Sequence, residues 1–261
     1  MPLLSVLWGI ALLAVIATTV MDATGTSRKL ADNGLYAAEA DAIAEAAIVR
    51  AAIGLSDPTS GTGWRADGRP RQFELRKWRA VVRIQDELGR IDLNFADQDL
   101  LFGLLRSVGS EPQKATALAV SIIQWRMMPV PGVSASGQPQ RRLFHAVNEL
   151  LLVPGVSQDL FARIEPALTV YSQRPTFDPQ LAPPEALLAL PGATRDQVAQ
   201  TLARRAQDTL GVGPSLKGRA FSLAIETTDG SHKRAYRAAI RFTDDPAKPY
   251  WLLDFQIVSK S

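Results

Sequence analysis

The chain has 261 residues, of which 46% are hydrophobic and 21% are charged, an ordinary balance for one large or two small globular domains. Its 29 basic and 26 acidic residues leave a net charge of +3, which by itself does not indicate a nucleic-acid-binding surface. The absence of cysteine excludes a disulfide framework. The two histidines, His145 and His232, lie far apart in the sequence and give no sign of a soft-metal site.

An apolar segment opens the chain. Residues 3–21 contain no charge, and a helix of that length spans roughly 28 Å, close to the hydrocarbon thickness of a bilayer, about 30 Å. No basic region precedes this segment and it is longer than the core of a signal peptide, so we predict a retained membrane anchor. The anchor residues are expected to be Leu3, Leu4, Val6, Leu7, Trp8, Ile10, Leu12, Leu13, Val15, Ile16 and Val20.

Residues 27–55 continue the helical pattern beyond this segment. Apolar and small residues recur at spacings of three and four, whereas Glu39, Asp41 and Glu45 are expected to face water. Gly54 and Asp57-Pro58 are expected to end the helix. The apolar stripe is rich in alanine, so a neighbouring subunit can approach it closely, and the same half of the helix is also expected to pack on its own domain. The predicted partner interface consists of Leu35, Ala38, Ala42, Ala46, Val49 and Ile53.

Strand and helix signals follow one another in the middle of the chain. Alternating apolar residues predict strands at 73–75 and 81–84, and residues 90–93 are expected to extend the same sheet. The stretch 128–142 is rich in Pro, Gly and Ser and is predicted to be an exposed loop. Helical periodicity predicts helices at 97–107, 112–127, 147–153, 158–170, 183–190 and 195–208.

The helical region repeats itself. Residues 150–157, LLLVPGVS, resemble residues 187–194, LLALPGAT, and residues 91–96, IDLNFA, resemble residues 177–182, FDPQLA. These echoes predict two small helical modules, each opened by an Asp-containing turn. The residues expected to form structural turns are Asp92, Asn94, Gly155, Asp178 and Gly192.

The last fifty residues change period. Apolar residues alternate at 221–225, 236–240 and 251–257, and the sequence TDGS at 228–231 is a hairpin signal between the first two. We expect these three strands to join the strands at 72–85 in one antiparallel sheet, with the helical region inserted between them.

The order of several short motifs resembles the minor pseudopilin K family of bacterial type II secretion systems, general secretion pathway protein K. The opening MPLLSVLW is similar to the mature N-terminus of that family, and YAAEAD at 36–41 to its small-residue stretch. DELGRIDLN at 86–94 is similar to its strand-to-helix junction. VNELLLVPG at 147–155 and LLALPG at 187–192 resemble its two helical modules. The resemblance extends over essentially the whole chain.

The resemblance, together with the element pattern, defines the expected fold. The predicted fold class is α+β, with a long N-terminal transmembrane helix packed on a pilin-like antiparallel sheet and a large inserted all-α domain of two small helical modules. The predicted domains are the transmembrane half of the helix at 1–21, its periplasmic half at 22–55, the sheet at 56–94 plus 211–261, and the inserted helical domain at 95–210.

The resemblance also implies a function. It implies a non-enzymatic minor pseudopilin at the tip of the type II secretion pseudopilus that supports export of folded proteins from the periplasm across the outer membrane. Its implied partners are the minor pseudopilins I and J, and a prepilin peptidase if a leader exists upstream. The implied location is the bacterial inner membrane, with a single span and the bulk of the chain in the periplasm. Ser5 stands where ordinary pilins carry Glu, which suits the K-type subunit.

No cofactor is expected. Some members of the family bind calcium with acidic residues in the block after Trp125 and in the loop that follows. Here residues 126–142 contain neither Asp nor Glu, whereas calcium prefers several oxygen ligands that include carboxylates. We therefore do not expect this chain to have the calcium site of that family.

Three other interpretations fit parts of the sequence. The two Pro-Gly motifs resemble helix-hairpin-helix DNA-binding elements, but Ser157 and Thr194 occupy the second glycine positions, so no nucleic acid is expected as a partner. The chain lacks G-x-S-x-G, H-E-x-x-H and glycine-rich phosphate-loop motifs, so no enzyme is expected. A single-pass anchored domain outside any pilus predicts that the apolar stripe at 35–53 is fully buried against its own sheet, whereas a pseudopilin predicts that part of it stays exposed.

Overall fold

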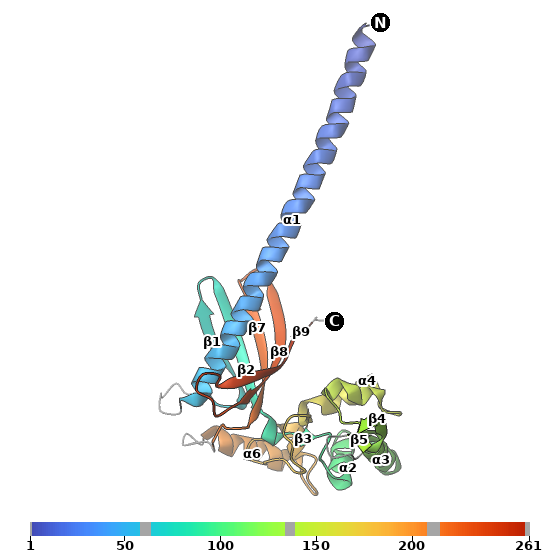
Figure 1. The fold of residues 1–261 in the computed structure, drawn as a ribbon, viewed down its shortest axis with the longest axis vertical. Coiled ribbons are helices and arrows are strands. Elements are labelled where there is room, and N and C mark those ends of the chain that lie inside the picture. Colours follow the sequence, from blue (N-terminus) through green and yellow to red (C-terminus); the bar gives the residue numbers. More distant parts are fainter. Residues whose placement is uncertain (1, 58–63, 134–138, 208–214, 259–261) are drawn as a thin grey trace.

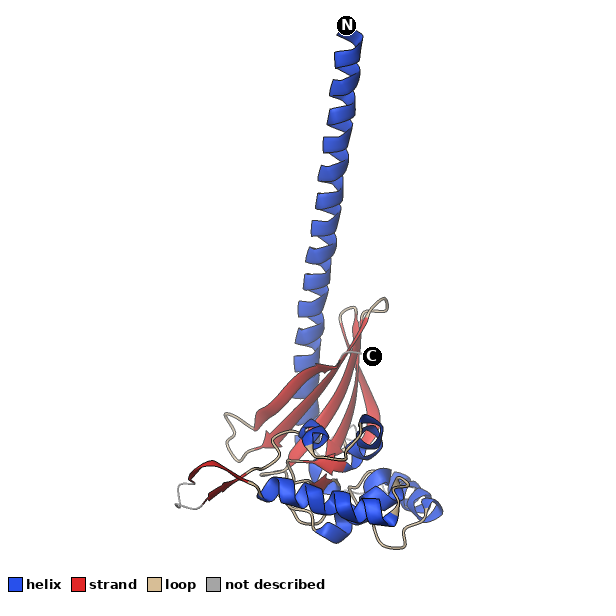
Figure 2. Cartoon of the chain, turned by 90° about the vertical axis from the view of Figure 1, so that its right-hand side faces the viewer, coloured by secondary structure: helices blue, strands red, loops and turns tan. Residues whose placement is uncertain are grey.

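The computed structural model describes residues 2–57, 64–133, 139–207 and 215–258, with the side chains of 2–6, 9–29, 130–141 and 206–207 excepted. A single helix, α1 (Pro2–Ser56), sets the long axis of the molecule. The C-terminal part of α1 lies along one face of an antiparallel sheet, and its N-terminal part projects alone (Figures 1 and 2). A group of short helices lies at the far end of the sheet from the N-terminus.

The main sheet has five antiparallel strands in the order β1-β2-β7-β8-β9. Its central pairing joins distant segments, since Val82 of β2 lies opposite Ile225 of β7. Residues 87–219 therefore leave the sheet after β2 and return to it at the neighbouring strand, and we call the described part of this insertion the helical block. The strands are β1 (Asp67–Leu75), β2 (Trp78–Asp86), β7 (Ala220–Thr228), β8 (Lys233–Phe242) and β9 (Tyr250–Val258).

Alanines bring α1 close to the main sheet. One face of the helix carries a run of buried alanines at spacings of four, three and four, and small side chains allow a helix to approach a sheet closely. They form one core with alternate residues of the central strands, as expected for strands buried on one face. The buried helix residues are Ala40, Ala44, Ala47 and Ala51, and their partners in the sheet include Val82, Ile84, Leu223 and Ile225.

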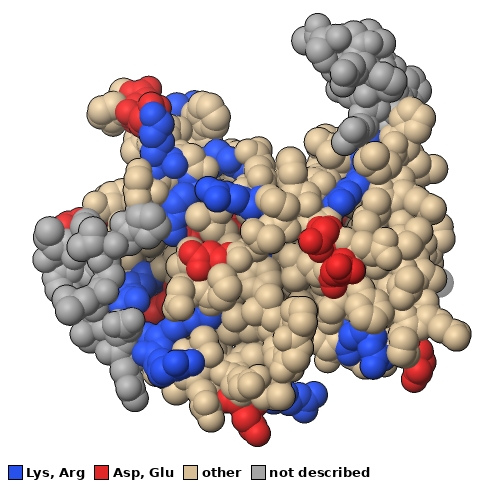
Figure 3. All heavy atoms as spheres, turned by 90° about the horizontal axis from the view of Figure 1, so that it is seen from below, with Lys and Arg blue, Asp and Glu red and all other residues tan. Residues whose placement is uncertain are grey.

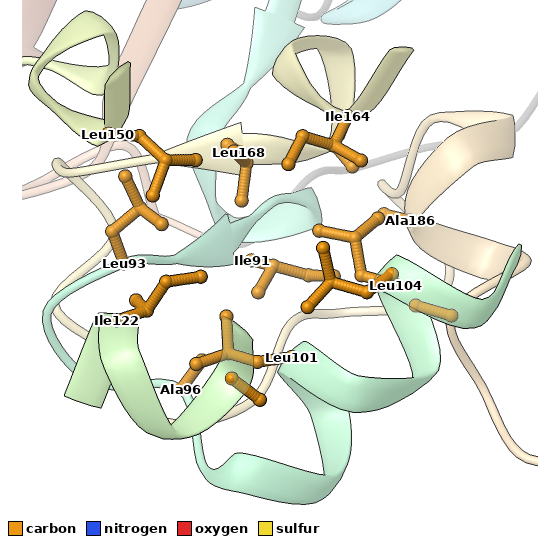
Figure 4. Close-up of a cluster of buried hydrophobic side chains, with 14 of the residues drawn as sticks. Ile91, Leu93, Ala96, Leu101, Leu104, Ile122, Leu150, Ile164, Leu168 and Ala186 are labelled. Carbon is orange, nitrogen blue, oxygen red and sulfur yellow. The ribbon is translucent and has the colours of Figure 1, made fainter. Parts of the chain in front are cut away.

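The helical block has its own core, separate from that of the main sheet (Figure 4). Leu101 and Leu104 point from one helix toward Ile91 and Ile122, with Leu150 and Leu168 closing the opposite side. The helices of the block are α2 (Gln98–Ser107), α3 (Pro112–Met127), α4 (Gln158–Ile164), α5 (Pro184–Leu187) and α6 (Arg195–Gln207), with 3-10 turns at Glu87–Gly89, Val147–Leu152 and Glu165–Ala167.

Polar contacts hold the two units together at their junction. Asp86, at the end of β2, is fully buried and pairs with Arg219, just before β7. Burial raises the pKa of Asp86, and the Arg219 guanidinium opposes that rise. The side-chain amide of Gln85 donates to the Leu181 carbonyl at 2.8 Å. Two contacts therefore bind the helical block to the end of β2, one through Asp86 and one through Gln85.

Two predicted elements are wrong. Residues 90–93 do not extend the main sheet, because β3 (Ile91–Asp92) pairs in parallel with β6 (Leu168–Thr169) inside the helical block. The predicted loop at 128–142 instead contains an antiparallel pair, β4 (Pro129–Val133) and β5 (Pro139–Arg141).

Two predicted helices are shorter than expected, and one is of another type. The helix predicted at 158–170 ends at Ile164, since Pro166 has no N–H to continue it. The helix predicted at 183–190 covers only the four residues of α5, and the one predicted at 147–153 is a 3-10 helix. The first strand also begins earlier than predicted, at Asp67 rather than at Phe73.

The Gly103→Ala substitution is expected to destabilise the helical block. A Cβ at Gly103 would lie 2.1 Å from the carbonyl oxygen of Ala189, so α2 and the segment after α5 must move apart. Overpacking against backbone costs about 3 kcal/mol. Urea unfolding monitored by the fluorescence of Trp125, which packs against the core of the helical block, measures the loss.

The matched control is Gly34→Ala, in the interior of α1. A Cβ there has no atom within 4 Å among the described residues, so this substitution is expected to stabilise the helix by about 0.5–1 kcal/mol. Equal stability of the Gly103→Ala variant and the unmodified protein would show that the close approach of α2 is not needed.

Candidate functional site

The predicted partner stripe lies on the side of α1 that faces away from the main sheet. Leu35 is 62% exposed and Ile53 is 56% exposed, whereas Ala40 and Ala44 have no exposed area. At 3.6 residues per turn these two sets occupy opposite sides of the helix. Five stripe members are exposed and one is half-buried; they are Leu35, Ala38, Ala42, Val49 and Ile53, with Ala46 half-buried. We call these six residues the α1 stripe.

The position of the α1 stripe argues against one alternative interpretation of the sequence, a single-pass anchored domain outside any pilus. A lone anchored domain requires the stripe to be buried against the chain's own sheet, and the structure has it exposed. The residues that do face the sheet were missed by the sequence reasoning. Their signal was present as a second series of alanines at helical spacing, beginning at Ala40.

Polar contacts on both flanks of α1 set the rotation of the helix about its axis. On one flank, the Asp41 carboxylate accepts hydrogen bonds from the Tyr236 hydroxyl at 2.8 Å and from Arg234 at 3.1 Å. On the other flank, the Glu39 carboxylate accepts from the Trp78 indole at 3.2 Å and pairs with Lys77 at 2.7 Å. These contacts keep the α1 stripe turned outward.

The same contacts correct one expectation. Glu39 and Asp41 were predicted to face water, but both are half-buried and bonded to strands, whereas Glu45 is exposed as predicted. Hydrogen bonds from Lys77 and Trp78 lower the pKa of Glu39. Sequence periodicity alone does not reveal such contacts, because their partners lie on strands distant in the sequence.

The expected membrane anchor lies mostly outside the described side chains. The backbone of α1 continues through residues 3–21, and Leu7 and Trp8 are exposed. Within the part of the chain that the structure describes with its side chains, no helix is both long and apolar enough to cross a membrane. The other anchor residues fall outside the side chains that the structure describes: Leu3, Leu4, Val6, Ile10, Leu12, Leu13, Val15, Ile16 and Val20.

Asp92 is a buried hydrogen-bond acceptor within the helical block. One carboxylate oxygen accepts from the Asn94 N–H at 2.8 Å, and the other accepts from the Gln173 N–H at 2.8 Å and the Ser172 hydroxyl at 3.1 Å. Burial raises the pKa of Asp92, and these three donors oppose the rise. Asn94 exchanges two hydrogen bonds with the backbone of Phe144, at 2.8 and 2.9 Å. Both predicted turn residues thus join segments far apart in the chain.

The other three predicted turn residues lie in local turns. Gly155 and Gly192 have φ of 91° and 71°, the left-handed region that favours glycine. Asp178 is exposed, and its carboxylate accepts from the Gln180 N–H at 2.8 Å. Asp178 therefore differs from its repeat counterpart Asp92, which is buried.

The residues after the two Pro-Gly motifs begin helices. The Ser157 hydroxyl accepts from the Leu160 N–H at 3.2 Å and caps α4. Thr194 and Gln197 exchange hydrogen bonds at 3.0 and 3.3 Å, which is a capping box. The hydroxyl side chains that replace the second glycine of a helix-hairpin-helix are thus used as helix caps.

The structure offers little for metal or nucleic-acid chemistry in its described part. No three His, Cys, Asp or Glu side chains there lie together in an arrangement able to hold a metal ion. After Trp125, where the resemblance implied acidic residues, Arg126 donates to the carbonyls of Leu93 at 2.8 Å and Ala96 at 2.7 Å. On the face of the helical block seen from below, Lys and Arg are interspersed with Asp and Glu (Figure 3), unlike a uniformly basic surface.

Comparisons with known proteins identify the fold. No protein-family model matches the sequence, and no curated protein matches it either. Among solved structures, the chain is similar to a chain of the GspK-GspI-GspJ complex from the enterotoxigenic Escherichia coli type 2 secretion system. The TM-score is 0.55 with 15% sequence identity, and the match covers 91% of this chain and 99% of that chain. The chain has a mixed fold of helices and antiparallel sheet that is pseudopilin-like.

Proposed function

We propose that this protein is a minor pseudopilin of the K type at the tip of a type II secretion pseudopilus, where it supports export of folded proteins. The observation that carries the proposal is the α1 stripe, an apolar and alanine-rich helix face turned away from the protein's own sheet. The shared fold supports it, since the similar solved chain belongs to a complex of GspK, GspI and GspJ.

The α1 stripe has the chemistry of a helix-packing surface. Ala38, Ala42 and Ala46 present only methyl groups, so a second helix can approach closely along them. Leu35, Val49 and Ile53 add apolar area near the two ends. Exposed apolar patches of this kind mark interaction sites. We propose the minor pseudopilins I and J as the partners that cover it.

In this proposal the two halves of α1 have different surroundings. Residues 3–21 anchor the protein in the inner membrane, and the bulk of the chain lies in the periplasm; the apolar composition of 3–21 supports this placement. A prepilin peptidase acts on the protein if a leader lies upstream. The protein acts as an assembly component rather than as an enzyme, and it needs no cofactor.

The Ala42→Arg substitution tests the proposal. Ala42 is exposed at the centre of the α1 stripe, so arginine is tolerated by the fold but places a charge and extra volume between packed helices. Losses of about 2–4 kcal/mol at the centre of an interface weaken affinity roughly 30- to 1,000-fold. Size-exclusion chromatography and calorimetric titration with pseudopilins I and J from the same organism measure the effect.

The matched control is Ala117→Arg, an identical change at an exposed position of α3 in the helical block. It is expected to leave binding of I and J unchanged. If Ala42→Arg binds I and J as tightly as the control does, the α1 stripe is not the interface, and the proposed function loses its main support.

A further inference from the structure

The two edges of the main sheet differ in character. The β1 edge carries Pro70 together with Arg69, Arg71 and Glu74, and charge and proline are the usual means by which proteins keep a sheet edge from pairing with other chains. The β9 edge reads YWLLDFQIV and has Asp254 as its single charged residue. One edge is therefore protected against pairing and the other is not.

The backbone of β9 is paired on one side only. Its inner side pairs with β8 in antiparallel register, with an irregularity opposite Ala239 and Ile240. On its outer side β9 pairs with no other strand of the described residues, and Figure 1 places it at the margin of the sheet near the C-terminus. A nine-residue edge presents a row of N–H and C=O groups that fits another extended backbone.

Apolar side chains of β9 are exposed on both faces of the sheet. Leu252 and Ile257 lie opposite Ile240 and Tyr236, on the face that α1 covers elsewhere, and both are about half exposed. Trp251 lies on the other face and is also about half exposed. A helix laid on one face covers one of these sets, whereas a strand added to the edge extends both faces and covers both sets.

We propose that β9 is a docking strand, to which an extended apolar segment of a neighbouring pseudopilin adds as a sixth strand. The inference rests on the proposed function and deepens it by naming a second contact surface. The strand edge is about 30 Å long and about 5 Å wide, well below the ~800 Å² per partner of a stable interface. The same neighbour must therefore also contact another surface, and the α1 stripe is exposed for it.

A second copy of this chain fits the edge less well. Two β9 edges that pair symmetrically are antiparallel, so the two copies are related by a twofold axis perpendicular to the sheet. Their α1 helices would then point in opposite directions. The proposed anchoring in one membrane requires them to point the same way, which favours a different pseudopilin as the occupant.

Hydrogen–deuterium exchange on the full-length protein, alone and with pseudopilins I and J, tests the proposal. The expected result is additional protection, seen only in the complex, of the amides at 250–258 that do not already pair with β8. The Trp251→Lys substitution is expected to weaken binding at least tenfold, while its matched control Leu75→Lys, at an exposed apolar residue of the β1 edge, leaves binding unchanged. Both positions are exposed, so neither variant is expected to unfold.

The outcomes separate the two proposals. A complex that forms without protection at 250–258, or that Trp251→Lys and Leu75→Lys weaken equally, overturns the docking strand and leaves the proposed function intact. Absence of any complex with I and J overturns both. Protection at 250–258 that appears on concentrating this protein alone assigns the edge to a second copy and overturns the choice of a different pseudopilin.

Discussion

The Ala44→Arg substitution is expected to prevent α1 from packing on the main sheet and to lower the free energy of unfolding by more than about 4 kcal/mol. Ala44 has no exposed area and packs on the central strands, so arginine both overfills the contact and buries an unpaired charge. Near-ultraviolet circular dichroism and the fluorescence of Trp78, which belongs to this core, report the loss of packing.

Ala42→Arg is the control for this experiment, because it introduces the same side chain two residues earlier on the exposed face of α1. Its stability is expected to stay within about 0.5 kcal/mol of the unmodified protein. The two variants therefore have opposite profiles, one unfolded and one folded but deficient in partner binding. Similar stabilities for both would mean that the helix is rotated relative to the sheet from the orientation described.

The Asp92→Ala substitution is expected to destabilise the helical block by about 3–5 kcal/mol, because it leaves three donors without their acceptor at a buried site. Asp92→Asn replaces one acceptor oxygen by an amide that cannot accept, so it is expected to cost less than alanine but more than 1 kcal/mol. Urea unfolding followed through Trp125 gives both values.

Asp178→Ala is the matched control, since Asp178 occupies the corresponding position of the sequence repeat but is exposed. It loses one solvent-accessible hydrogen bond and is expected to cost less than about 1 kcal/mol. An equal cost at both positions would mean that burial of Asp92 does not decide its contribution.

Elements governed by local sequence were predictable. The helix predicted at 112–127 begins at Pro112 and ends at Met127, since proline suits a first helical turn and the apolar period continues to that point. The three C-terminal strands follow from strict alternation and from the hairpin turn after Thr228.

Elements governed by distant partners were not predictable. The two-residue strand at Ile91 exists because it pairs with Leu168, which lies far away in the sequence. The strands at 129–133 and 139–141 were not predicted, because their segment is rich in Pro, Gly and Ser, a composition typical of loops. Short strands of this kind carry too few residues for alternation to be visible.

The candidate site was predictable in one respect. Helical periodicity identified the residues of the α1 stripe, but α1 carries two alanine series and periodicity does not say which one faces the chain's own sheet. The bonds from Arg234 and Tyr236 to Asp41 decide that question, and they come from a strand nearly 200 residues later. The β9 edge needed the sheet order, which sequence patterns alone do not provide.

The place where the helical block is inserted has a consequence for how proteins of this fold can diverge. The block departs after Asp86 and returns before Phe221, and these two residues face each other as ordinary neighbours in an antiparallel pair. Strands in this arrangement can be joined by a short hairpin turn, so the pairing of β2 with β7 does not by itself require the helical block between them. The insertion can therefore change in size or surface while the α1 stripe and the β9 edge keep their positions, which in the proposed function separates variation at the exposed end of the pseudopilus from the proposed contacts.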